Sequence, residues 1–330
     1  MKLASLPTSG FSHRDGDLVL VSRDGLRAVK PNIPGVVCLR EAVEQWDTVQ
    51  PQLELLARTL ENGTCANTFA FPAAKALAPL PRCPGFYDGS SFLSHVVRAR
   101  KARGDEPPAT LKTIPLMYQG VSDGLLGGQS PLEILDPHFG ADFEGEFGVV
   151  VGDVPRGISP KEALYFIRLV VLLNDITLRE VLKKEIEFKF GFLQSKPNSS
   201  FAPLAVTLDE LGEAWQGGRV HLDLQVTWNS TPFGHPHGKE MFFHFGELIA
   251  HAARTRPLSA GSIVGSGTVS NEDAGRGFAC LTEKRCHEII HDGAARTRWL
   301  APDDRVQMFV MHNGFSVFGA LDQTACLTAQ

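Results

Sequence analysis

The segment over residues 142–151, D-F-E-G-E-F-G-V-V-V, restricts the fold more than any other stretch of this sequence. Alternate residues of a β-strand point to opposite faces of a sheet, so a strand here has two faces of opposite character. One face is apolar, with Phe143, Phe147, Val149 and Val151, and the other is acidic, with Asp142, Glu144 and Glu146. Carboxylates this close raise one another's pKa unless a cation lies between them. The segment therefore predicts a strand with one buried face and, on the other, either solvent or a bound cation.

The composition is that of a globular protein, with 43% of the 330 residues hydrophobic and 21% charged. This length allows one large domain, or a large domain together with a small one. The 32 lysines and arginines against 37 aspartates and glutamates give a net charge of −5. We therefore expect no nucleic acid and no anionic membrane among the partners, because a net negative chain does not attract either.

The most apolar run, residues 169–173, is far shorter than a membrane-spanning helix. Residues 1–7 lack the apolar core of a signal peptide. The six cysteines are scattered and include no C-x-x-C pair, which argues against disulfides and against a thiolate zinc site. These features predict a cytoplasmic protein.

The start of the chain has the pattern of a small β-rich unit. Residues 18–22 and 26–29 form two apolar runs around an Asp-Gly turn, which predicts a hairpin. Residues 39–60 have the apolar spacing of a helix that ends at Asn-Gly. Residues 76–85 are rich in proline and predict an irregular linker. We therefore expect a small N-terminal domain over residues 1–75 and a larger domain over residues 76–330.

The larger part mixes short strands with Gly/Pro loops and few helices. Ser159-Pro160-Lys161-Glu162 is a capping box that predicts a helix start. Residues 169–175 predict a buried strand, and residues 245–255 predict a second helix. The expected fold class is mixed, mainly β with α.

The sequence H-E-I-I-H over residues 287–291 matches the signature of zinc proteases, which requires a helix. Residues 279–290 alternate as a strand does, and Asp292-Gly293 has the form of a hairpin turn. On a strand the two histidines would be roughly 13 Å apart, too far for one zinc ion. The pattern therefore predicts a hairpin strand and no zinc site.

Two glycine-containing segments carry weaker signals. His235-Pro236-His237-Gly238 contains a possible metal pair, but its Gly and Pro predict an exposed loop. The segment G-S-G-T-V-S over residues 265–270 lacks the third glycine of a dinucleotide-binding loop. Its backbone N–H groups and the Thr268 hydroxyl could still hold a carboxylate.

Several polar residues stand where apolar ones would be expected, and each alone has an ordinary explanation. Asp175 ends a predicted strand, where it could act as a cap. His95 follows Asp88 and could be a surface histidine, and Lys196 could extend its amine into water.

The order of seven short motifs along the chain is more informative than any one of these residues. The motifs are D-G-S-S-F-L-S-H, Y-Q-G, D-F-E-G-E, L-L-N-D-I-T-L-R-E, G-F-L-Q-S-K, G-S-G-T-V-S and L-T-E. This order resembles the fumarylacetoacetate hydrolase family, from about residue 86 to the C-terminus. The resemblance implies a β-roll with a small N-terminal β-rich domain, and a homodimer.

The resemblance also implies a divalent cation held by Asp88, Glu144, Glu146 and Asp175. Four carboxylates form a hard oxygen site, which suits Mg²⁺ or Ca²⁺ better than zinc. The implied catalytic pair is His95 and Glu283, with Lys196 assisting. The implied substrate-binding residues are Tyr118, Arg179, Lys196 and Thr268.

Three positions depart from the fumarylacetoacetases of the family. Ser90 and Ile186 stand where the family has tyrosines, and Leu182 stands where it has a glutamine. The metal-site and catalytic motifs of the family are present in this sequence, whereas these three residues of the substrate pocket differ from those of the fumarylacetoacetases.

The implied reaction is hydrolysis of a carbon–carbon bond in a dicarboxylic β-diketone, fumarylacetoacetate giving fumarate and acetoacetate in phenylalanine and tyrosine catabolism. Within the family the alternatives are acylpyruvate hydrolysis, 2-oxoacid decarboxylation and isomerisation. An alternative of another class is a non-catalytic protein stabilised by Ca²⁺. His95 and Glu283 favour hydrolysis over decarboxylation, because decarboxylation needs no activated water. A structural cation site would have no use for His95, Glu283 and Lys196 in this order.

Overall fold

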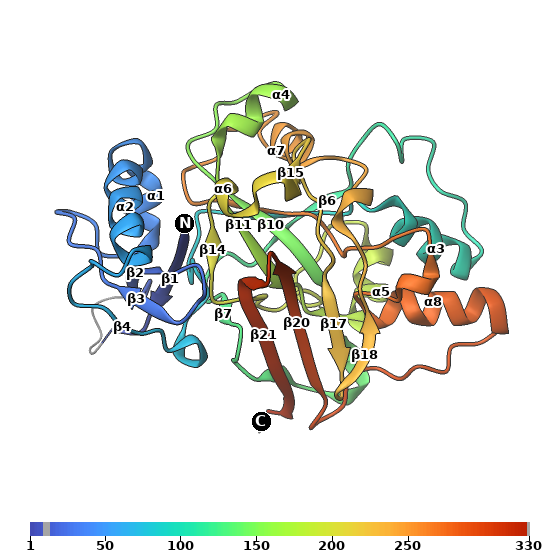
Figure 1. Cartoon of the computed structure of the whole chain (residues 1–330). Helices are drawn as coiled ribbons and strands as arrows, with labels where there is room; N and C mark the ends of the chain where they lie inside the picture. The colour runs from blue at the N-terminus through green and yellow to red at the C-terminus, as the bar shows by residue number, and fades with distance from the viewer. Residues whose placement is uncertain (9–13, 329–330) are drawn as a thin grey trace.

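The computed structural model describes residues 1–8 and 14–328. Within these residues the strands form one sheet of twelve strands, one of five and two of two. The N-terminal unit lies on the left of Figure 1, and α3 (Leu93–Arg103) and α8 (Leu281–Asp292) lie together on the right. The mixed, mainly β fold is as predicted. The strands of the large sheet are β1 (Lys2–Leu6), β2 (Asp17–Val21), β3 (Arg27–Val29), β4 (Phe69–Ala70), β5 (Phe86–Gly89), β6 (Met117–Gly120), β7 (Leu126–Gly127), β10 (Gly145–Val151), β11 (Ile167–Asn174), β13 (Ser200–Phe201), β14 (Ala205–Val206) and β19 (Ile263–Gly265).

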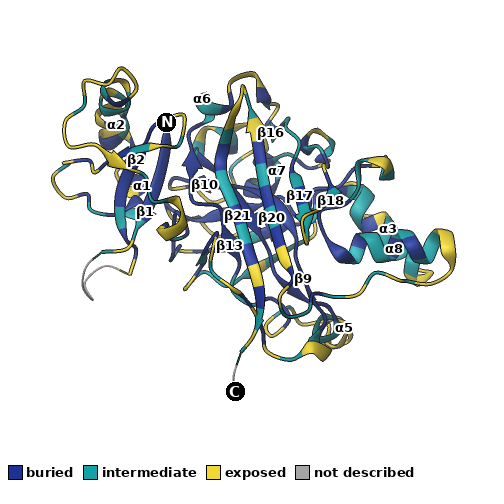
Figure 2. Cartoon of the chain, turned by 60° about the horizontal axis from the view of Figure 1, so that its bottom comes forward, coloured by how far each residue is buried: buried dark blue, intermediate teal, exposed yellow. Residues whose placement is uncertain are grey.

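The five-stranded sheet, in the order β18-β17-β20-β21-β8, packs against the large one. Phe147 of β10 and Phe318 of β21 meet between the two sheets, with ring centroids 6.2 Å apart. Figure 2 shows most strand residues buried, while α5 is largely exposed. The remaining strands are β8 (Leu132–Ile134), β9 (Ala141–Asp142), β12 (Thr177–Leu178), β15 (Trp215–Gln216), β16 (Arg219–Val220), β17 (Gln225–Trp228), β18 (Thr231–Gly234), β20 (Arg305–His312) and β21 (Phe315–Leu327).

The middle of the large sheet has the order β11-β10-β19-β5. β10 runs antiparallel to both β11 and β19, and β19 runs parallel to β5. The predicted acidic strand is interrupted, because β9 ends at Asp142 and β10 begins at Gly145. All seven residues of β10 are buried, so neither face of this strand is open to solvent.

The N-terminal strands continue the large sheet, because β1 pairs with β14. The predicted hairpin is present as β2 and β3. The helix predicted over residues 39–60 is divided at Gln45, whose φ of −112° is not helical. The segment over residues 76–85 is irregular, as expected, but Ala78 and Leu80 are buried, so it is packed into the structure. The division at residue 75 stays a prediction.

The predicted capping box at Ser159 begins α4, and the helix predicted over residues 245–255 is α7. Among the described residues, no helix is long and apolar enough to cross a bilayer. The helices are α1 (Leu39–Glu44), α2 (Trp46–Glu61), α3 (Leu93–Arg103), α4 (Pro160–Ala163), α5 (Arg179–Phe188), α6 (Leu208–Leu211), α7 (Phe245–Ala252) and α8 (Leu281–Asp292).

The predicted hairpin strand over residues 279–290 was wrong, because this segment contains α8. The Asp142 carboxylate accepts hydrogen bonds from the backbone N–H groups of Leu281 and Thr282, which satisfies the start of the helix. Gly293, with φ of 81°, ends the helix in the left-handed region. The Asp-Gly pair that resembled a hairpin turn is therefore a helix C-terminus.

Candidate metal centre and active site

Three buried carboxylates converge from neighbouring strands of the large sheet. Asp88 lies on β5, Glu146 lies on β10, and Asp175 directly follows β11. One carboxylate oxygen from each residue lies within 4.8 Å of the other two. The order β11-β10-β19-β5 explains why the three carboxylates converge. The strand that precedes Asp175 is next to the strand of Glu146, and only β19 separates the strand of Glu146 from that of Asp88.

The strand between them leaves room for the two side chains at Gly265. Gly265 is paired with Asp88 across β19 and β5. A Cβ at this position would lie 2.2 Å from Asp88 Oδ1 and 3.4 Å from Glu146 Oε2. The absence of a side chain at Gly265 is therefore what allows the carboxylates to meet.

The donor set fits a divalent cation. Both carboxylate oxygens of Glu146 are buried without a hydrogen-bond partner among the described residues. Burial, together with the charges of Asp88 and Asp175, raises the pKa of Glu146 well above its usual range. Burial and the Asp175 charge raise the pKa of Asp88 to about 7. A hard divalent cation would remove both penalties, and carboxylate oxygens are its preferred ligands.

The Asp175 carboxylate is fixed by three donors. It accepts from the Tyr118 hydroxyl at 2.7 Å and from Ser199 Oγ at 2.6 Å. Lys196 Nζ lies 2.5 Å from Asp175 Oδ2 and 2.7 Å from Glu144 Oε2. The buried ammonium therefore joins Asp175 to Glu144.

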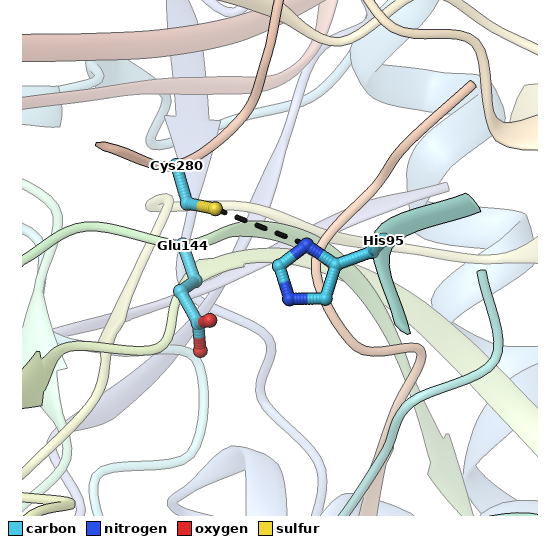
Figure 3. Close-up of side chains that lie close together, drawn as sticks. All are labelled: His95, Glu144 and Cys280. Carbon is cyan, nitrogen blue, oxygen red and sulfur yellow. Dashed lines mark hydrogen bonds between the residues drawn. The ribbon is translucent and has the colours of Figure 1, made fainter. Parts of the chain in front are cut away.

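Glu144 lies at the break between β9 and β10 and points to a second group of side chains. Arg179 Nη2 and Lys196 Nζ contact its two oxygens, and Thr177 Oγ1 donates at 3.0 Å. Burial opposes ionisation, but the charges of Arg179 and Lys196 outweigh it, so the pKa of Glu144 falls below its usual range. Figure 3 shows Glu144 beside His95 and Cys280, and ligand atoms of the three lie within 4.8 Å of one another. Since two cationic groups already contact the Glu144 oxygens, this group does not offer a second metal site.

His95 and Glu283 form a pair across two helices. His95 on α3 places Nδ1 3.2 Å from Oε2 of Glu283 on α8. The side chain of Glu283 is 1% exposed and that of His95 is 16% exposed. Burial raises the pKa of Glu283, but hydrogen bonds from His95 and Ser270 and the charge of Arg98 lower it overall. Glu283 is thus an ionised carboxylate that orients the imidazole.

The structure places the predicted substrate-binding residues around this centre, with different neighbours. The Arg179 guanidinium contacts Asp142 at 2.8 Å and Glu144, so its contacts are to the protein. Thr268 is buried on the loop after β19, next to Gly267, whose N–H donates to Asp88 Oδ1 at 3.2 Å. The substrate roles of Tyr118, Arg179, Lys196 and Thr268 stay predictions.

Three residues of the site were missed by sequence reasoning. Asp142 holds both Arg179 and the start of α8. Cys280 Sγ accepts from the Glu283 N–H and lies 4.0 Å from His95 Nδ1. Arg98 contacts Glu283. Asp142 carried a signal as part of the acidic face, and Arg98 carried one because it follows His95 by one helical turn.

Comparison with protein families identifies the chain. Residues 86–324 match the model of the fumarylacetoacetate (FAA) hydrolase C-terminal domain, and residues 1–82 match fumarylacetoacetase N-terminal domain 2. The chain belongs to the fumarylacetoacetate hydrolase family.

Among curated proteins, the chain is 24% identical to the oxaloacetate tautomerase YisK of Bacillus subtilis, over 74% of this chain and 78% of that protein. It is 27% identical to a 2,4-didehydro-3-deoxy-L-rhamnonate hydrolase of Sphingomonas sp., over 48% of this chain and 54% of that protein. The match thus spans about half the length of this second relative.

Solved structures with the same fold include a maleylpyruvate hydrolase from Sphingobium sp. in complex with manganese (II) ion and pyruvate. That structure has a TM-score of 0.64 at 14% identity, with 100% of both chains covered. The 5-carboxymethyl-2-hydroxymuconate delta-isomerase from Mycobacterium smegmatis has a TM-score of 0.62 at 16% identity, also with 100% of both chains covered. Hydrolases, isomerases and a tautomerase thus all occur among the similar proteins.

We expect divalent-cation affinity to rise with pH through about 7, because the cation must displace protons from Asp88 and Glu146. Folding raises the pKa of both Asp88 and Glu146. Their contribution to the stability of the metal-free protein is therefore largest below their ordinary pKa, and it is lost as the pH rises through their raised pKa. The melting-temperature increase caused by Mg²⁺ or Mn²⁺ should therefore be larger at about pH 8 than at about pH 6. Differential scanning fluorimetry measures it, and equal shifts at both pH values would contradict the assignment.

His291→Ala should leave turnover within a few-fold of wild type. The reason now differs from the sequence argument, because His287 and His291 do lie one turn apart on α8, with ring centroids 4.3 Å apart. Within residues 1–8 and 14–328, neither histidine belongs to a cluster of three or more metal-ligating side chains. Metal analysis of the purified variant checks this, and loss of stoichiometric zinc together with activity would show the prediction to be wrong.

Proposed function

We propose that this protein is a divalent-metal-dependent hydrolase that cleaves a carbon–carbon bond in a β-diketone acid. The observation that carries the proposal is the position of the His95–Glu283 pair beside a buried cluster of carboxylates, of which Glu146 has no hydrogen-bond partner among the described residues. In this proposal the carboxylate cluster binds the cation, and the His95–Glu283 pair activates the water.

The proposed ligands of the cation are Asp88, Glu146 and Asp175. Glu144 would join them only by giving up its contact with Lys196, which now bridges it to Asp175. A cation bound there supplies Lewis-acid stabilisation of negative charge that develops on the diketone oxygens. Mg²⁺, Ca²⁺ and Mn²⁺ all suit oxygen ligands, and the manganese complex of the similar maleylpyruvate hydrolase makes Mn²⁺ a candidate.

The protein side chains supply the proton transfers. His95 takes a proton from water, and the hydroxide formed attacks one carbonyl carbon of the diketone. Glu283 holds the imidazole in place and stabilises the imidazolium that results. The bond to the central carbon then breaks, leaving a carboxylic acid and a carbanion that Lys196 helps to protonate.

Fumarylacetoacetate and acylpyruvates are the proposed substrate candidates. Both contain the β-diketone, and the similar solved structures include hydrolases named for maleylpyruvate and fumarylpyruvate. The differences at Ser90, Leu182 and Ile186 from the fumarylacetoacetase pattern make acylpyruvates the first compounds to test.

The competing function is tautomerisation of a 2-oxoacid, which one relative of this chain performs by name. Ultraviolet absorbance together with the mass of the products separates the two. Hydrolysis removes the β-diketone absorbance completely and yields two products, whereas tautomerisation yields an isomer of the same mass. The assay should be run with metal-loaded enzyme, with EDTA, and with EDTA followed by Mg²⁺ or Mn²⁺. Loss of absorbance that is insensitive to EDTA would contradict the proposal.

We also propose a cytoplasmic homodimer. Phe188, Phe190 and Leu193, which lie at and after the end of α5, are 75%, 100% and 82% exposed, and exposed apolar groups of this size mark contact surfaces. Sedimentation velocity measures the oligomeric state, and a monomer at micromolar concentration would contradict the dimer.

A further inference from the structure

We infer that Arg98 is a positioning residue for the His95–Glu283 pair and that it acts through Glu283. This inference rests on the proposed function, in which Glu283 orients His95. Helices α3 and α8 lie side by side (Figure 1). Arg98 and His95 lie one turn apart on α3, and both side chains contact Glu283 of α8. The two side chains contact different oxygens of the Glu283 carboxylate. Arg98 Nη1 contacts Oε1, and His95 Nδ1 lies 3.2 Å from Oε2.

The guanidinium is fixed on several sides. Its Nη1 also lies 3.3 Å from Ser270 Oγ, and its Nη2 donates to the carbonyl oxygens of Asn271 and Glu272, each at 2.6 Å. The guanidinium carbon lies 5.8 Å from the centroid of the Phe278 ring. With its side chain only 14% exposed, Arg98 has little freedom to move away.

This arrangement limits the orientation of the carboxylate. Ser270 Oγ donates to Oε1 at 2.6 Å, so two donors hold the oxygen that His95 does not use. With Oε1 fixed, Oε2 can face only the imidazole of His95. The positive charge of Arg98 also helps to keep a carboxylate that is 1% exposed ionised at this position.

A purely structural role has to be separated from this one, because Arg98 also ties the loop over residues 270–272 to α3. If Arg98 only held the part of the loop that does not touch Glu283, its loss would have the same effect whether or not residue 283 were a carboxylate. If it acts through Glu283, the two substitutions must be strongly non-additive.

The experiment is a double-mutant cycle with Arg98→Met and Glu283→Gln, assayed with the β-diketone acid that the wild-type enzyme turns over. Arg98→Met should lower kcat by about tenfold to a hundredfold, the range that the loss of a partner of a metal-ligating histidine typically costs. KM and Mn²⁺ affinity should change by less than about threefold, since Arg98 touches none of the three clustered carboxylates. In the Glu283→Gln background the same substitution should change kcat by less than about threefold.

Arg98→Lys, which keeps the charge, should recover part of the lost kcat. Lys101→Met is the matched control, because it removes an exposed positive charge from the same helix, and its kcat should stay within about twofold of wild type. If Arg98→Met lowers the melting temperature strongly, Arg98→Gln, which keeps hydrogen-bond donors without charge, serves in its place.

Wild-type kcat in Arg98→Met, with His95→Ala inactive, would overturn this inference and leave the proposed function standing. An equal loss in both backgrounds would also overturn it, since the effect would then come from the loop. Wild-type turnover in His95→Ala would overturn the proposed function and this inference with it.

Discussion

His95→Ala should lower turnover by roughly 10²–10⁴, the usual contribution of a general base. In the proposed reaction the proton acceptor is the imidazole and not Glu283, because Glu283 is buried and held by three groups. Steady-state kinetics on an accepted β-diketone acid measure the loss. Mn²⁺ affinity, followed by calorimetry, should stay within about threefold of wild type, because His95 is not among the clustered carboxylates.

Glu283→Gln should cost no more than His95→Ala, and the double variant should be far from additive, because Glu283 acts through the imidazole. His291→Ala is the matched control, a histidine removed from the exposed end of α8. If His95→Ala keeps wild-type turnover on every β-diketone acid tried, the hydrolytic mechanism fails and a metal-dependent tautomerase becomes the better explanation.

Glu146→Gln should weaken Mg²⁺ and Mn²⁺ binding by at least about a hundredfold and abolish metal-dependent activity. Glu146 is the most informative ligand to change, because both of its oxygens lack a hydrogen-bond partner among the described residues. An amide therefore removes charge from the site without breaking a bond that holds the fold. Calorimetric titration of the metal-free protein measures the affinity.

The same variant makes a prediction about stability. A buried carboxyl without a partner destabilises the metal-free fold when it loses its proton, so Glu146→Gln should melt no lower than wild type in EDTA at about pH 8. Glu187→Gln, at an exposed position on α5, controls for the loss of a carboxylate and should bind metal normally. Unchanged metal affinity in Glu146→Gln would show that the carboxylate cluster is not the metal centre.

The sequence predicts the family from the order of its motifs, and local patterns predict two of the strands that carry the site, β10 and β11. The apolar run predicted as a strand over residues 169–175 is short and rich in β-branched residues, and it lies in β11, which covers Ile167–Asn174. The family resemblance implied four carboxylates, and the fold brings three of them together, Asp88, Glu146 and Asp175, whereas Glu144 contacts Arg179 and Lys196.

What the sequence could not predict depends on long-range contacts. α8 was taken for a strand because its alternation and its Asp-Gly end are ambiguous, whereas its start is fixed by Asp142, which lies far away in the chain. The acidic strand was expected to present one continuous carboxylate face. Its interruption at Glu144, which turns that side chain to Arg179 and Lys196, follows from tertiary contacts that no local pattern contains.

Hydrolysis in water enriched in heavy oxygen tests the central claim most directly. Hydrolytic cleavage of a β-diketone acid places one atom of solvent oxygen in the newly formed carboxylate, which mass spectrometry of that product detects. We predict this label with metal-loaded enzyme, and no label above background with EDTA or with His95→Ala. Metal-dependent consumption of the substrate that yields only an unlabelled isomer, or a decarboxylated product, would contradict the account.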